Sequence, residues 1–181
     1  NYFICFVGFG FDMYGLRKIA ENPSSIKNKS EVLSNVFTTK IYLEILSIIF
    51  FITLILLFPN LRENIWVYII CFTTTLVNIF FPTWYFQGIQ KMRVVTYIQL
   101  LFKLLSLPFI FTFVRTPDDI LVFSIIMTTS SLLGAFYAFI HLFIFEGIKI
   151  RIVTINRVKA YVVESQYFFY TNFLNIMKAQ T

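Results

Sequence analysis

Long uninterrupted runs of apolar residues alternate with polar segments along this chain. A helix needs about 20 mostly apolar residues to cross the hydrocarbon core of a bilayer, and four runs approach or exceed that length: Ile41–Phe58, Ile65–Trp84, Val94–Val114 and Ile120–Phe145. The runs are continuous and longer than the alternating strands of about 10 residues that build a membrane barrel. Because a lipid-facing backbone must satisfy its own hydrogen bonds, the pattern predicts an all-α polytopic membrane helical bundle.

Two shorter apolar runs lie near the ends of the chain. Tyr2–Leu16 has the composition of the last part of a span, and Tyr167–Met177 has that of the first part of another. Residue 1 is Asn, and neither a basic segment nor a small-residue cleavage site accompanies the first run, so it does not have the pattern of a signal peptide. We expect the chain to be an internal piece of a longer polytopic protein.

Lys and Arg are distributed unevenly over the connections between the spans. One set of alternate connections holds Arg17, Lys18, Lys27, Lys29, Lys40, Lys91, Arg93, Lys149, Arg151, Arg157 and Lys159, and the opposite set holds Arg62 and Arg115. The positive-inside rule places the first set in the cytoplasm. In that set we expect two long basic loops, Lys18–Thr39 and residues 146–165.

The composition excludes a soluble globular enzyme. Hydrophobic residues make up 58% of the 181 residues, and charged residues only 13%, against about 25% charged residues in a soluble domain. The net charge of +6 would indicate nucleic-acid binding in a soluble protein, but here the basic loops account for it. Cys5 and Cys71 both lie in apolar stretches, without the spacing of a metal site or disulfide framework.

One lysine lies in the middle of a predicted span. A charge at that depth costs at least about 2.5–3.5 kcal/mol on insertion scales. Thr96, Gln99, Lys103 and Ser106 recur at helical spacing on one face, which we expect to look toward the protein interior or a wet cavity. Two interpretations of Lys103 stay open: it lines a path for an anionic substrate, or it pairs with a carboxylate on a neighbouring helix.

A second polar stripe begins the span Ile41–Phe58. It consists of Lys40, Glu44 and Ser47. We expect Lys40 to extend toward the cytoplasmic interface. Glu44, about one turn deeper, can pair with Lys40, pair with a charge on another helix, or serve as a proton-coupling carboxylate.

Small residues surround an aspartate in the first apolar run. Gly8, Asp12 and Gly15 share one helical face, which lets another helix approach closely. Arg17 and Lys18 follow directly, so we expect Asp12 to form an interfacial ion pair with Arg17.

The span Ile65–Trp84 is polar along part of its length, at Thr73–Thr75 and Asn78. Trp66 and Trp84 are about 27 Å apart along a helix, which predicts one indole ring at each membrane interface. No catalytic triad, HExxH motif or glycine-rich phosphate loop is present in the sequence. We therefore expect no enzymatic activity, no cofactor and no metal, and we interpret Asp118–Asp119 as a helix cap.

Four segments resemble the Wzx-type polysaccharide flippases, which transport O-antigen and capsule repeat units. Gly8–Ala20 and Ser30–Lys40 are similar to the region of the second and third helices of that family. Phe81–Met92, with the string Pro-Thr-Trp-Tyr-Phe-Gln-Gly-Ile, resembles its best-marked motif at the cytoplasmic end of the fourth helix, and Glu164–Phe169 resembles the entry to its seventh helix.

The resemblance implies a member of the multidrug/oligosaccharidyl-lipid/polysaccharide exporter superfamily, with two six-helix bundles around a central cavity and alternating access. Residues 1–145 would then form helices two to six of the first bundle, residues 146–165 a basic cytoplasmic loop between the bundles, and residues 166–181 the start of the second bundle. The expected location is the bacterial inner membrane. Expected partners are the lipid-linked oligosaccharide, membrane lipid, a polysaccharide polymerase and a chain-length regulator, and no nucleic acid.

On this interpretation the substrate is an undecaprenyl-pyrophosphate-linked repeat unit for O-antigen, capsule or exopolysaccharide biosynthesis. The candidate pathway residues are Lys103, Gln99, Lys40, Arg17 and Asn78, and the candidate ion-coupling residues are Glu44 and Asp12. Two alternatives stay open: a multidrug exporter of the same superfamily, and a polytopic polysaccharide polymerase or glycosyltransferase.

Overall fold

A computed structural model describes residues 10–62, 65–116 and 119–166 of the chain, and every regular element within these residues is helical. The elements are α2 (Phe11–Glu21), α3 (Ile26–Leu57), the 3₁₀ turn η1 (Pro59–Arg62), α4 (Ile65–Phe80), α5 (Thr83–Gly88), α6 (Met92–Phe113) and α7 (Ile120–Ile144). Residues 155–166 form a further helix. The predicted all-α fold is confirmed.

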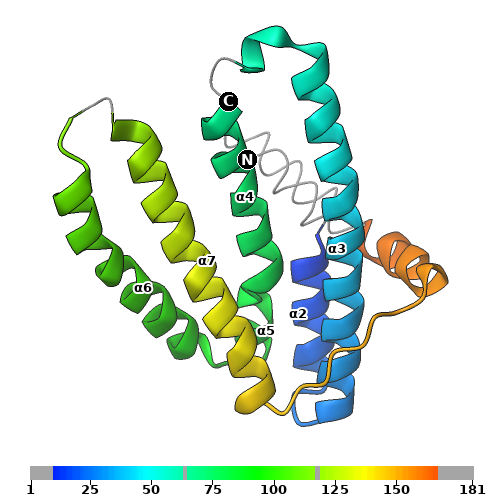
Figure 1. Cartoon of the computed structure of the whole chain (residues 1–181). Helices are drawn as coiled ribbons and strands as arrows, with labels where there is room; N and C mark the ends of the chain where they lie inside the picture. Colours follow the sequence, from blue (N-terminus) through cyan, green and yellow to red (C-terminus); the bar gives the residue numbers. More distant parts are fainter. Residues whose placement is uncertain (1–9, 63–64, 117–118, 167–181) are drawn as a thin grey trace, which may run out of the picture.

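Four segments are long and apolar enough to cross a membrane: Ile26–Leu57, Ile65–Gly88, Met92–Phe113 and Ile120–Ile144. Each contains or closely matches one of the four predicted spans, which confirms the polytopic bundle. The helices run up and down beside one another, so the connections before α3, before α6 and after α7 lie at one end of the molecule (Figure 1). These are the basic connections, and the end they share is the one that the positive-inside rule assigns to the cytoplasm.

The predicted long loop Lys18–Thr39 is wrong. α2 continues to Glu21 and α3 begins at Ile26, so only residues 22–25 connect them. Ser25 caps α3, because its hydroxyl accepts a hydrogen bond from the Asn28 N–H at 3.2 Å. The first turns of α3 are polar enough to escape a search for apolar runs, although they are helical.

The segments assigned to the two ends of the chain are described only in part. The first apolar run is described from residue 10 onward, and residues 167–181 lie outside the described residues. Within the predicted inter-bundle loop, residues 155–165 are helical. The division into a first bundle, a connecting loop and a second bundle stays a prediction.

Pro82 separates α4 from α5 within one predicted span. Proline has no N–H to donate and disfavours a helical conformation in the residue before it, so α4 ends at Phe80. The short α5 then ends in a turn at Gln90, whose φ of 59° is left-handed. The Lys91 N–H closes this turn by donating to the Phe86 carbonyl at 2.8 Å.

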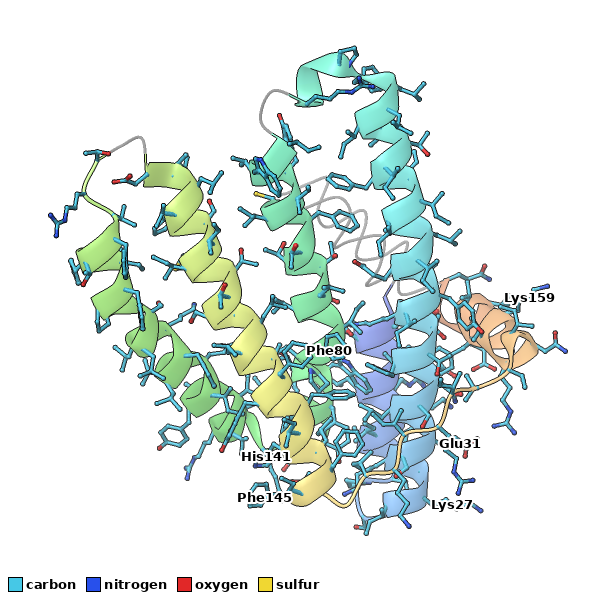
Figure 2. All side chains as sticks on the ribbon, viewed as in Figure 1. Lys27, Glu31, Phe80, His141, Phe145 and Lys159 are labelled. Atoms are coloured by element: carbon cyan, nitrogen blue, oxygen red, sulfur yellow. The ribbon has the colours of Figure 1, made fainter. Side chains whose placement is uncertain are left out.

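Aromatic rings join α4 to α7. The Phe80 ring lies 4.8 Å from the ring of Phe136 and 5.4 Å from that of Phe139, measured between centroids. Figure 2 shows Phe80 between the two helices, with His141 and Phe145 farther along α7 toward the cytoplasmic end. Ring pairs at these separations stabilise packing beyond the area they bury.

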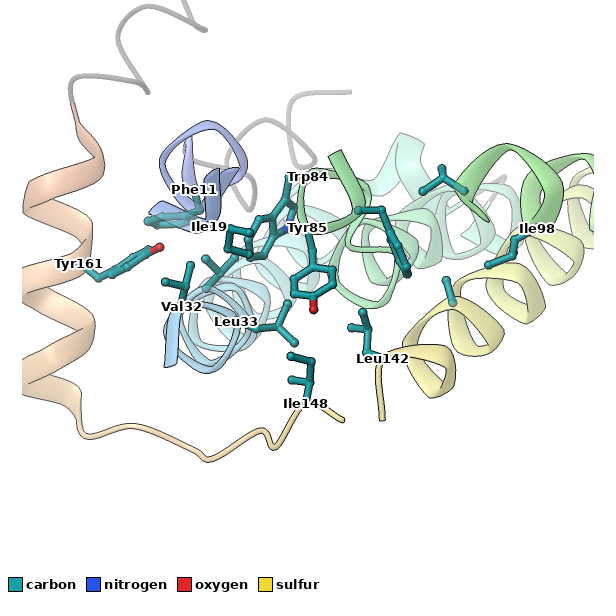
Figure 3. Close-up of a cluster of buried hydrophobic side chains, with 14 residues drawn as sticks. Phe11, Ile19, Val32, Leu33, Trp84, Tyr85, Ile98, Leu142, Ile148 and Tyr161 are labelled. Carbon is teal, nitrogen blue, oxygen red and sulfur yellow. The ribbon is translucent and has the colours of Figure 1, made fainter. Parts of the chain in front are cut away.

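The buried core lies toward the cytoplasmic end and gathers side chains from distant parts of the chain (Figure 3). Tyr85 of α5 lies at its centre with no exposed surface, and Ile148 and Tyr161 reach it from the segment after α7. Toward the other end large apolar side chains are exposed, including Leu56 and Leu57, which are 64% and 67% exposed. An apolar surface of this kind is suited to lipid rather than to water.

Trp84 is buried within the protein rather than turned toward lipid, and the predicted depth of its ring stays a prediction. Trp84 is 5% exposed, because its indole packs directly on Gly15 of α2. A Cβ atom at Gly15 would lie 2.7 Å from the ring, so glycine is what permits this contact. Trp66, by contrast, is 67% exposed near the opposite end of α4.

Candidate functional site

A buried lysine ties three helices together. The Lys40 ammonium of α3 donates hydrogen bonds to Asp12 Oδ1 of α2 at 2.6 Å, to Asn78 Oδ1 of α4 at 3.0 Å and to the Asn78 carbonyl at 3.2 Å. These three acceptors match the three donors of an ammonium group. Lys40 is 1% exposed. Three of the seven candidate site residues therefore meet in one cluster, Lys40–Asp12–Asn78.

This cluster corrects two predictions. Lys40 does not extend its side chain out to the membrane interface, because its buried ammonium is held inside the bundle by Asp12 and Asn78. Asp12 does not pair with Arg17. The exposed Arg17 guanidinium instead lies 3.3 Å from Glu21, which also lies 3.6 Å from Lys18.

Glu44 lies one turn farther along α3 and is 4% exposed. Its Oε1 accepts a hydrogen bond from the Thr75 hydroxyl of α4, and Lys40 is not its partner. Among the described residues no hydrogen-bond partner reaches Glu44 Oε2 or the buried hydroxyl of Ser47. Polar atoms buried in this way are usually satisfied by water or an ion.

A hollow of about 240 Å³ lies between α4, α6 and α7. It is lined by Val77, Phe81, Gln99, Phe102, Lys103, Ser130, Ser131 and Gly134. Lys103 and Gln99 both line this hollow, which has a mixed polar and apolar lining. The predicted inward-facing stripe is confirmed only at Ser106, which is buried, whereas Thr96, Gln99 and Lys103 are exposed. Lys103 forms no ion pair with a described carboxylate, so the predicted alternative of a neighbouring acidic partner is not observed in the described part of the chain.

The walls of this hollow are fixed by contacts between α6 and α7. The Ser130 hydroxyl donates to the Phe102 carbonyl at 2.6 Å. The Phe102 ring passes so close to Gly134 that an added Cβ would lie 3.3 Å from it. The Ser106 hydroxyl donates to the Lys103 carbonyl at 2.7 Å, which directs the buried end of the polar stripe back onto its own helix.

The hollow and the Lys40–Asp12–Asn78 cluster adjoin each other along α4 but have no residue in common. Val77 lines the hollow, and Asn78, the next residue, binds Lys40. Arg17 contacts neither group and lies on the last turns of α2 at the cytoplasmic end. The candidate residues therefore lie in three places rather than in one continuous site. Lys103 and Gln99 line the hollow, Lys40, Asp12 and Asn78 form the ion cluster, and Arg17 lies at the exposed basic end.

The acidic pair before α7 is placed only in part, because Asp118 lies outside the described residues. Asp119 Oδ2 accepts hydrogen bonds from the N–H groups of Arg115 and Thr116, each at 2.9 Å, and from the Thr116 hydroxyl at 3.0 Å. These bonds stabilise the carboxylate and lower the pKa of Asp119. Asp119 thus holds the turn that precedes the helix, and in the described ranges no cluster of three or more His, Cys, Asp or Glu could hold a metal.

Sequence reasoning missed one set of polar contacts. The hydroxyls of Ser30, Ser34 and Thr38 accept hydrogen bonds from backbone N–H groups of the segment after α7. The signal was present in the sequence as three hydroxyl residues at spacing of four, which share one face of a helix.

Residues 1–180 match a family model described as "Polysaccharide biosynthesis protein". Over 138 residues the chain is 32% identical to a protein of Escherichia coli (strain K12) described as "Putative O-antigen transporter". This similarity covers 76% of the chain and 33% of that relative, so the chain spans about a third of the relative's length. No solved structure matches the chain.

Proposed function

Since the chain belongs to the polysaccharide biosynthesis protein family, we propose that it is part of a flippase for undecaprenyl-pyrophosphate-linked oligosaccharide repeat units. The complete protein would move these units from the cytoplasmic to the outer leaflet of the bacterial inner membrane by alternating access. The observation that carries the proposal is the position of Lys103 at the middle of α6. It lines a hollow between helices long enough and apolar enough to cross a membrane, and it has no ion pair within the described part of the chain.

The chemistry of the substrate explains what a cation at this position does. A pyrophosphate group is strongly anionic, and its transfer through the bilayer requires cationic hydrogen-bond donors within the protein. Lys103 supplies a charge at the middle of α6, while Gln99 and Ser131 supply neutral hydrogen-bonding groups in the same hollow. These neutral groups are suited to water and to sugar hydroxyls.

The closed cluster and the buried glutamate take different roles in this proposal. Lys40 has all three donors occupied, so with Asp12 and Asn78 it holds the helices around the pathway. Glu44 has a buried oxygen with no hydrogen-bond partner in the described ranges, and we therefore favour it for coupling transport to a proton or sodium gradient. Arg17 lies exposed at the cytoplasmic end, where it would meet the headgroup first.

The test is complementation of O-antigen synthesis by the complete protein at matched expression. Lys103→Ala removes the cation and is expected to lower transport at least about tenfold, the effect of losing roughly 1.4 kcal/mol of charge-assisted binding. Lys103→Arg keeps the charge and should retain most of the activity. Leu104→Ala is the matched control, because Leu104 is an exposed neighbour on the same helix. Wild-type transport by Lys103→Ala would overturn the proposed role.

A further inference from the structure

The segment after α7 is fastened along α3 by its backbone. The N–H groups of Lys149, Arg151 and Val153 donate to the hydroxyls of Ser30, Ser34 and Thr38, at 3.2, 3.0 and 3.4 Å. Every second residue of the segment therefore meets every fourth residue of the helix. Four helical residues rise about 6 Å and two extended residues about 6.7 Å, so a nearly straight chain matches the helix turn by turn. We call residues 148–153 the strap.

The first four residues of the strap, 148–151, alternate between apolar and cationic. Ile148 is buried in the core and Ile150 packs against it, whereas Lys149 and Arg151 are exposed. In an extended chain alternate side chains point to opposite sides. The three backbone hydrogen bonds therefore hold two positive charges on the side of the strap that faces away from the core.

These charges border a hollow of about 710 Å³ between the strap and α3. It is lined by Ile26, Lys27, Ser30, Glu31, Ser34, Gly147, Lys149, Arg151, Val153 and Arg157. Figure 2 shows Lys27 and Glu31 on neighbouring turns near the cytoplasmic end of α3. Glu31 pairs with Arg157 at 3.2 Å, whereas Lys27, Lys149 and Arg151 have no ion pair with any residue in the described ranges.

The inner part of the hollow lies at the depth of lipid headgroups, and its outer part extends toward the aqueous side. A hydrocarbon core of about 30 Å takes about 20 residues of α3, which reach from Leu57 back to Thr38. Ser34 then lies about 6 Å beyond the core and Ser30 about 12 Å beyond it. Since the headgroup layer is about 5–7 Å thick on each side, Arg151 lies within it, and Lys149 lies about one Debye length from its phosphates.

We propose that this hollow binds the phosphate headgroup of an anionic phospholipid of the cytoplasmic leaflet. Arg151 and Lys149 supply charge-assisted hydrogen bonds to the phosphate oxygens, and Lys27, farther from the bilayer, adds longer-range positive charge. Val153, whose N–H donates to Thr38 at the edge of the core, supplies apolar contact to the glycerol end of the lipid. Basic pockets at the cytoplasmic side of membrane bundles recognise such headgroups. This role concerns resident lipid and is independent of which molecule is transported.

The experiment measures lipid binding to the purified complete protein in neutral detergent. Dioleoylphosphatidylglycerol and dioleoylphosphatidylcholine are titrated separately, and bound lipid is counted by native mass spectrometry. The wild type should retain the anionic lipid preferentially. The double variant Lys149→Gln/Arg151→Gln should bind it about 30-fold more weakly, given a contribution of about fivefold for each cation near the surface. Lys27→Gln, which alters the opposite wall farther from the bilayer, should weaken binding by about twofold, because the attraction falls off within a Debye length.

The matched control is Arg93→Gln/Lys159→Gln, which removes the same charge from exposed cytoplasmic positions outside the hollow. It should keep the wild-type affinity for the anionic lipid. A melting curve in phosphatidylcholine alone establishes that each variant is folded. If Lys149→Gln/Arg151→Gln is not folded, the comparison of Lys27→Gln with the wild type tests the proposal.

Three results would overturn the proposal. The first is no preference for the anionic lipid, and the second is equal weakening in the hollow and control variants. The third is saturation of the wild type by inorganic pyrophosphate without lipid, with no further effect of phosphatidylglycerol, because the site would then take a soluble anion.

Discussion

The Lys40–Asp12 ion pair predicts an asymmetric response to mutation, because its two side chains differ in burial. The Lys40 side chain is 2% exposed and the Asp12 side chain is 38% exposed. Asp12→Ala therefore leaves a buried ammonium, whereas Lys40→Met leaves a carboxylate that water can reach. Removing one partner of a buried pair costs about 3–5 kcal/mol when the remaining charge stays buried.

The size of each effect follows from the bonds that remain. After Asp12→Ala the ammonium keeps its two bonds to Asn78, so we expect a loss near the lower end of that range, about 3 kcal/mol. After Lys40→Met the Asp12 carboxylate regains solvent and the apolar stem still fills the site, so we expect about 1 kcal/mol. The double variant leaves no buried charge and should be about as stable as Lys40→Met, which is roughly 3 kcal/mol better than additivity.

Unfolding of the complete protein in mixed micelles, titrated with dodecyl sulfate, measures these free energies. Glu21→Gln is the control, since it breaks the pair with Arg17 in which both side chains are at least half exposed, and it should change stability by less than about 0.5 kcal/mol. Equal losses for Lys40→Met and Asp12→Ala, or additive losses in the double variant, would contradict a buried ammonium held mainly by Asp12.

Three further predictions use the same protein. Gly15→Ala brings a methyl group against the Trp84 ring and should lower the unfolding free energy by about 1–3 kcal/mol; wild-type stability would contradict that close contact. Thr75→Val removes the hydrogen bond to the Glu44 carboxylate and should lower the unfolding free energy by about 1–3 kcal/mol. In a protein that already carries Glu44→Leu, the same substitution should change the unfolding free energy little. Because the pKa of Asp119 is lowered in the folded protein, the hydrogen bonds of its ionised carboxylate stabilise the fold fully above the ordinary carboxyl pKa of about 3.9. This stabilisation is lost only as pH falls through the lower pKa of the folded protein. Hydrogen exchange of the two amides it accepts from should therefore be faster in Asp119→Asn at neutral pH, and the two proteins should converge in acid; identical exchange at neutral pH would contradict the contact.

The membrane spans were predictable because lipid imposes a local requirement. A helix that faces lipid must be apolar over its whole length, so hydropathy alone locates it. The beginning of α3 obeys a different rule: Val32, Leu33 and Val36 are buried, but polar residues separate them from the apolar run. Family membership was also accessible, since the resemblance to polysaccharide flippases is confirmed by the family match.

Contacts between helices were not predictable in the same way. The partners Lys40 and Asp12 are 28 residues apart, and the sequence offered Arg17 as a nearer choice. Once α2 runs beside α3, Asp12 faces Lys40, while Arg17 lies about one and a half turns away among exposed side chains. The shared face of Lys103 and Gln99 was predictable because it belongs to a single helix, whereas the opposite wall, at Ser130, depends on how α7 packs.

The strap has a mechanical consequence. Because it is bonded to α3 at three successive turns and Ile148 and Tyr161 are buried on either side of it, the polypeptide between α7 and residue 166 has little slack. It behaves as a rigid arm of the helices described here rather than as a loose tether. A force applied to the chain beyond that arm is delivered to α2 and α3, the helices that carry the Asp12–Lys40 junction.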